Sequence, residues 1–174
     1  MDESRSRFLH ALNVVLPAAN AAMILSAWSR LPDRIPMHFG AGGRADGWGP
    51  KGPALMLDLL LPAGMTALLY LARRLMPWFR KHPGWINIPN RARFLALPPE
   101  EQALVFDLLG ETYVAMAAAL NVLFISLSVC TLQVAAGRLD GLPAWVIWPG
   151  LALIAATAIA YTVRTFRLVN RLTR

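Results

Sequence analysis

Cysteine and charged residues are both scarce in this chain of 174 residues. A single cysteine, Cys130, leaves no way to build a disulfide framework or a cysteine-based zinc site within one chain. Charged residues make up 16% of the sequence, whereas soluble domains carry roughly 25%. Together with a hydrophobic content of 56%, this composition predicts an integral membrane protein.

The net charge of +7 does not indicate nucleic-acid binding, because the cations flank hydrophobic segments instead of lining a polar face. Membrane topology and contact with anionic lipid explain these cations better. The lipid bilayer is therefore a predicted partner, and nucleic acid is not.

Four segments reach the length of about 20 mostly apolar residues that a membrane-crossing helix needs. They cover about residues 8–29, 54–72, 112–136 and 143–163. The sequence shows no internal repeat, so the four segments predict a single membrane domain over residues 1–174. The predicted fold is that of an all-α integral membrane protein with a four-transmembrane-helix bundle. Pro98-Pro-Glu-Glu favours a helix start, so residues 99–111 are expected to extend the third span beyond the hydrocarbon core.

Lysine and arginine residues are divided unequally between the two sides of such a bundle. Twelve lie in the N-terminus, the connection 73–111 and the C-terminus, whereas five lie in the loop 30–53 and the last connection. Because cytoplasmic segments carry an excess of these residues, both termini and the connection 73–111 are expected in the cytoplasm. The prediction is a multi-pass protein of the bacterial inner membrane with the loop 30–53 facing outward.

The outward loop is rich in proline and glycine and cannot be helical. In its first part, three apolar residues alternate with Pro36 and His38, which suits a short extended segment with one apolar side. Glycines at 40–43 can turn the chain, and residues 44–48 could return beside it as a short β-hairpin. That arrangement would bring His38 near Asp46.

Four polar residues lie inside or at the ends of the predicted spans. Asn20 and Asn121 fall near mid-span, where an unsatisfied amide is costly, so they are expected to bond to other helices or to each other. Asp58 follows Lys51 by seven residues on the same helix face, which makes an ion pair with Lys51 or Arg30 plausible. Glu111, at the cytoplasmic end of the third span, is expected to pair with a nearby arginine.

The candidates for a metal site are His38, Asp46 and Asp58. The other two histidines, His10 and His82, are expected on the opposite membrane face and cannot add ligands. No cofactor is predicted. Because no serine or cysteine nucleophile accompanies His38, an enzyme is less expected than a binding or structural protein.

Two pieces of the loop, Leu31-Pro-Asp-Arg-Ile-Pro-Met-His-Phe and Gly43-Arg-Ala-Asp-Gly-Trp-Gly-Pro-Lys51, carry a resemblance. They resemble the signature of a bacterial membrane domain of unknown function that forms the N-terminal part of SdpI-like immunity proteins. The resemblance covers roughly the first 75 residues, and the chain is similar to a stand-alone member without the full second domain. The matching loop residues are Pro36, His38, Phe39, Gly43, Asp46, Gly47 and Lys51.

This resemblance implies a protein that protects against, or senses, a membrane-active peptide through its outward loop. Two alternatives stay open, because a domain alone does not define a function. One is an accessory structural subunit that binds another membrane-protein subunit. The other is a metal- or ion-binding membrane protein.

Overall fold

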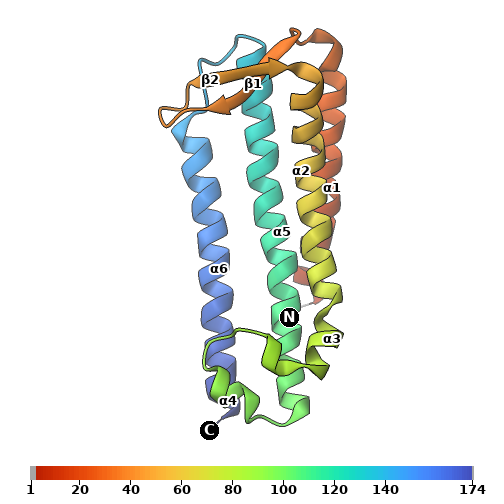
Figure 1. The fold of residues 1–174 in the computed structure, drawn as a ribbon, viewed down its shortest axis with the longest axis vertical. Helices are drawn as coiled ribbons and strands as arrows, with labels where there is room; N and C mark the ends of the chain where they lie inside the picture. Colours follow the sequence, from red (N-terminus) through yellow and green to blue (C-terminus); the bar gives the residue numbers. More distant parts are fainter. Residues whose placement is uncertain (1–2, 174) are drawn as a thin grey trace.

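Four long helices run side by side in the computed structural model, which describes residues 3–173 (Figure 1). Each of the four is long and apolar enough to cross a membrane, in agreement with the prediction of four apolar spans. Arg174, one of the cations counted above, lies outside the described residues. The four helices are α1 (Glu3–Ala27), α2 (Lys51–Arg74), α5 (Pro99–Ala135) and α6 (Ala144–Leu172).

The helices extend beyond the predicted spans. The α5 helix runs without interruption for 37 residues from Pro99, as the helix-start pattern predicted, and at about 1.5 Å per residue it is about 55 Å long. The α6 helix continues past residue 163 to Leu172 because its last turns also pack, with Thr165 and Val169 almost fully buried. The prolines Pro17 and Pro62 lie inside α1 and α2.

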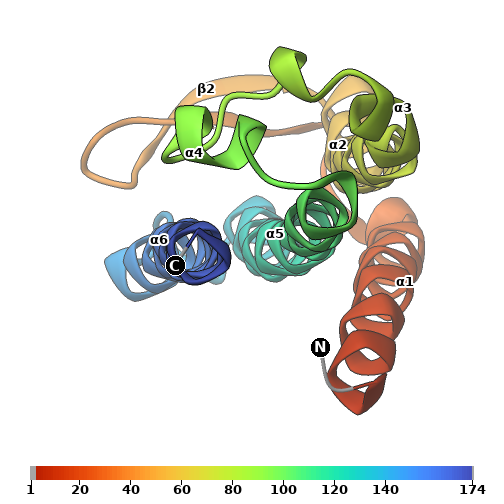
Figure 2. The same cartoon turned by 90° about the horizontal axis from the view of Figure 1, so that it is seen from below.

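The central helix of the bundle is α5. Half of its most apolar stretch of 18 residues is buried, against 17% in each of the other three helices. Figure 2 shows α1 and α6 on either side of α5, and α2 packs on it as well. Alanines permit this close approach of backbones, and those of α5 are buried at Ala115, Ala117, Ala118 and Ala119.

The two ends of the bundle carry different structures (Figure 1). One end carries the strands β1 (Arg34–Phe39) and β2 (Ala45–Pro50), and α1 starts and α6 ends at the other. The second end is closed by short helices that connect α2 to α5 and pack around the buried rings of Phe94 and Phe106. The short helices of that connection are α3 (Met76–Lys81), η2 (Pro83–Trp85) and α4 (Arg91–Leu95). A further short helix, η1 (Trp28–Arg30), follows α1 at the end that carries the strands.

The strands β1 and β2 form the antiparallel hairpin that the loop sequence predicted. Ile35 of β1 is fully buried among Leu31, Leu55 and other apolar residues, so the hairpin lies over the end of the bundle. The prediction that alternate residues give β1 one apolar, buried side is only partly confirmed, because Met37 is 47% exposed. The reason is an irregularity in the strand pairing between Pro36 and His38, which changes the alternation of the side chains.

Candidate functional site

Residues 31–51 form what we call the hairpin cap. Its turn depends on Gly43, whose φ of +76° falls in the left-handed region and whose N–H donates to the Gly40 carbonyl at 2.8 Å. The Leu142 N–H donates to the Gly43 carbonyl at 2.7 Å, and Arg44 pairs with Gly141. The cap is therefore bonded to the connection between α5 and α6, a contact that the sequence did not predict.

The predicted approach of His38 to Asp46 is confirmed. The Nδ1 atom of His38 lies 2.5 Å from Oδ1 of Asp46, with the side chains 72% and 54% exposed. Gly47 lies directly opposite, where a Cβ atom would come within 2.9 Å of the His38 Cβ. The motif thus places an imidazole–carboxylate pair on the solvent side of the cap.

Lys51 closes the cap against the start of α2. Its Nζ donates to the Leu31 carbonyl at 3.1 Å and lies 3.5 Å from the Asp33 carboxylate, and its N–H bonds to the Asp33 carbonyl at 2.8 Å. The structure therefore pairs Lys51 with Asp33 and not with Asp58, which had Lys51 or Arg30 as its predicted partner, because the lysine reaches back across the cap instead of along α2. Of the other two motif residues, Pro36 is buried and Phe39 is half-buried.

Asp58 does not join the His38–Asp46 pair. Across residues 3–173, no three His, Cys, Asp or Glu side chains gather closely enough to hold a metal ion. The backbone carbonyl of Asp58 accepts a hydrogen bond of 2.9 Å from the Asn20 Nδ2, and the residue is half-buried on α2. The three predicted metal candidates therefore divide into a pair in the cap and a separate residue on α2.

A second group of polar residues lies inside the bundle, and we call it the polar cluster: His10, Asn13, Thr66, Tyr70 and Asn121. The Asn121 Nδ2 donates to the Asn13 Oδ1 at 3.1 Å and to the Thr66 Oγ1 at 2.9 Å. The Tyr70 hydroxyl lies 2.6 Å from the His10 Nδ1 and 3.3 Å from the Asn13 Nδ2. These bonds join α1, α2 and α5.

The prediction that the mid-span asparagines bond to other helices is confirmed, for Asn121 within the polar cluster and for Asn20 outside it. The alternative that they bond to each other is wrong, because Asn121 bonds to Asn13 whereas Asn20 bonds to the Asp58 carbonyl of α2. Sequence reasoning missed most of the cluster, although helical spacing carries the signal. His10 and Asn13 are three residues apart and Thr66 and Tyr70 four apart, so each pair shares one helix face.

Glu111 lies at the end of the bundle opposite the cap. It lines a hollow between α5 and α6 together with Arg164 and Arg167. The structure therefore places Glu111 in one hollow with Arg164, one of the nearby arginines, and the ion pair itself stays a prediction.

Comparison with known proteins adds one family and one relative. Residues 15–66 match the family described as Domain of unknown function (DUF1648). This segment runs from α1 through the hairpin cap into α2. It confirms the predicted domain of unknown function, whereas the link to SdpI-like immunity proteins stays a prediction.

An uncharacterised protein of the archaeon Archaeoglobus fulgidus is 30% identical over 78 residues, which are 45% of this chain. The match spans 43% of that relative, less than half of its length. No solved structure matches the chain. The comparisons therefore identify the matched region without assigning it an activity.

Proposed function

We propose that this is a multi-pass protein of the bacterial inner membrane with both termini in the cytoplasm. Four apolar helices of sufficient length support a membrane location. The arginine-rich connection between α2 and α5 lies at the end where α1 starts and α6 ends, which supports a cytoplasmic assignment for that end. The hairpin cap then faces outward.

The proposed role of the cap is to bind a membrane-active peptide, and thereby to protect the cell or sense the peptide. The observation that carries this proposal is an exposed amphipathic surface on a fixed backbone. His38 is polar, whereas Met37 and Trp48 of the cap are 47% and 46% exposed, and Trp145 at the start of α6 is 74% exposed. Methionine and aromatic side chains are enriched at interfaces.

The backbone hydrogen bonds of the cap favour binding of a ligand. Backbone hydrogen bonds hold it at both ends, through Lys51 at the start of α2 and through Gly43 at the connection to α6. A surface that is already ordered loses little conformational entropy when a ligand binds. A peptide that partitions into the membrane interface would meet this surface between the exposed tryptophans.

Deletion of the gene, followed by challenge with membrane-active peptides, tests the proposal. We expect sensitivity to rise on deletion and to fall again with the wild-type gene, but not with Trp48→Ala. Truncation of an aromatic side chain at the centre of an interface lowers the affinity at least about tenfold. The matched control is Trp85→Ala, a tryptophan 75% exposed at the opposite end, which should restore resistance. Unchanged sensitivity in the deletion strain contradicts the proposal.

The second candidate function is that of an accessory subunit in a larger membrane complex. It is favoured by an exposed row of small residues on one face of α1, at Ala11, Ala18 and Ala22. Small residues permit close contact between membrane helices. Purification in mild detergent followed by mass spectrometry would find a stoichiometric partner that Ala18→Leu releases, whereas recovery of a lone monomer counts against this role.

A further inference from the structure

A groove runs along one side of the molecule between α5 and α6, and α1 lines its middle part. It consists of three hollows of 520, 350 and 630 Å³, taken from the cap end to the other end. The first two share Val122 and Leu153, so they are continuous. The third continues along the same faces of α5 and α6, because Ala115 follows Glu111 by one turn and Arg164 follows Tyr161 by one turn.

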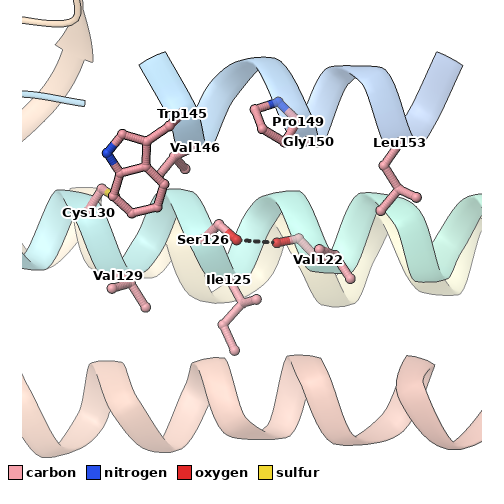
Figure 3. Close-up of a pocket in the computed structure, with 10 residues that line it drawn as sticks. All are labelled: Val122, Ile125, Ser126, Val129, Cys130, Trp145, Val146, Pro149, Gly150 and Leu153. Carbon is pink, nitrogen blue, oxygen red and sulfur yellow. Dashed lines mark hydrogen bonds between the residues drawn. The ribbon is translucent and has the colours of Figure 1, made fainter. Parts of the chain in front are cut away.

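The part of the groove nearest the cap is apolar. Figure 3 shows its lining of side chains from α5 and α6, with Trp145 at the cap end. The one hydroxyl in this lining, that of Ser126, donates to the Val122 carbonyl of its own helix at 2.8 Å. This part therefore suits a hydrocarbon occupant.

The far end of the groove is cationic. Arg164, Arg167 and Arg171 line it with two acids, Asp107 and Glu111. Asp107 also forms an ion pair with Arg80 of α3, which offsets its charge. The arginines therefore outnumber the acids at this end.

Two buried donors lie where the apolar and cationic parts meet. Tyr161 is 3% exposed and lines the middle hollow, and its hydroxyl has no hydrogen-bond partner in residues 3–173. The buried Nη1 of Arg164 likewise lacks a hydrogen bond within that range, and its guanidinium carbon lies 5.0 Å from the centre of the Tyr161 ring. Buried donors in native proteins are normally satisfied, which indicates an acceptor supplied from outside the chain.

We propose that an anionic phospholipid occupies this groove, with its phosphate on Tyr161, Arg164 and Arg167 and an acyl chain along the apolar part. The inference rests on the membrane location proposed above, which places the arginines at the cytoplasmic leaflet. The lengths agree, because Tyr161 follows Gly150 by eleven residues, a rise of about 16 Å or about half of the ~30 Å hydrocarbon core. One acyl chain of that leaflet would cover this distance.

Native mass spectrometry of the detergent-purified chain, with dioleoyl phosphatidylglycerol or dioleoyl phosphatidylcholine added, tests the charge requirement. We expect one phosphatidylglycerol to be retained in preference to phosphatidylcholine. Arg167→Gln with Arg171→Gln should lower this retention about thirtyfold, since each cation near an anionic headgroup contributes about five- to sixfold. The control pair, Arg74→Gln with Lys81→Gln, removes two exposed cations elsewhere at the same end and should retain the lipid.

A second pair of variants tests the acyl-chain path. Ala156→Phe fills the middle hollow, whereas Ala155→Phe adds the same ring at an exposed position of α6 that does not line the groove. Lipid should dissociate from the first variant and stay bound to the second.

Three outcomes overturn the proposal: equal retention of the two lipids, retention unaffected by the arginine and Ala156→Phe variants, or a polypeptide in place of the lipid. A polypeptide in the groove would be a second copy of the chain or another protein, released by Ala156→Phe. Fractionation of the wild-type protein with membranes is measured separately. A failure of the lipid site is therefore distinguishable from a failure of the proposed location.

Discussion

Substitution of Gly43 by alanine should detach the hairpin cap from the connection between α5 and α6. Gly43 has a φ of +76°, and a Cβ atom there would lie 2.4 Å from the Leu142 carbonyl oxygen. A left-handed conformation costs a non-glycine residue about 1–2 kcal/mol. Removal of the hydrogen bond from the Leu142 N–H to the Gly43 carbonyl adds about 1 kcal/mol. Opening of the cap should therefore become easier by about 2–3 kcal/mol.

Hydrogen exchange of the Leu142 amide measures this opening directly. A change of about 2 kcal/mol corresponds to about thirtyfold faster exchange. Gly42→Ala is a matched control, because Gly42 has open space around its Cβ position and is not among the positive-φ glycines of the described chain. Equal exchange rates in the two variants would refute the reasoning that Gly43 holds the cap in place.

Three further substitutions test the bundle and the cap. Asn121→Ala should lower the free energy of unfolding in detergent by about 1–3 kcal/mol, since it removes two interhelical hydrogen bonds. Its control, Ser126→Ala, removes only a hydrogen bond within α5 and should change the free energy of unfolding by about 0.5 kcal/mol or less. Equal effects of the two substitutions would contradict this. Ile35→Ala should cost about 2–4 kcal/mol because the side chain is fully buried, and a similar cost with the exposed Met37→Ala would argue against packing as the cause. His38→Ala should leave stability within about 0.5 kcal/mol, because its contact with Asp46 is exposed to solvent, and elemental analysis should find the metal content unchanged.

The long helices and the hairpin could be predicted from the sequence because local patterns determine them. Apolar runs predicted the four helices, Pro98-Pro-Glu-Glu predicted the start of α5, and the glycines after Phe39 predicted the turn that brings His38 to Asp46. These features depend on residues that are close in the sequence or on one periodic face.

The remaining contacts depend on residues far apart in the chain. The bond from Leu142 to Gly43 joins two backbones, and no side-chain pattern marks it. Asp33 and Asp58 are both near Lys51 in the sequence, and Lys51 pairs with Asp33 because of the path of the chain before α2. The position of α5 between α1 and α6 likewise follows from packing of small residues that occur in several of the helices, so the groove beside α6 could not be predicted.

Cysteine accessibility in intact cells tests the central claim, that the hairpin cap faces outward from a membrane. Ala41→Cys lies at the exposed turn of the cap, and Ala92→Cys lies at an exposed position of α4 at the other end. Both are made with Cys130→Ala, which removes the buried native thiol. We predict that a membrane-impermeant maleimide labels position 41 in intact cells and position 92 only after lysis. Labelling of position 92 in intact cells, with position 41 protected until lysis, would contradict the account.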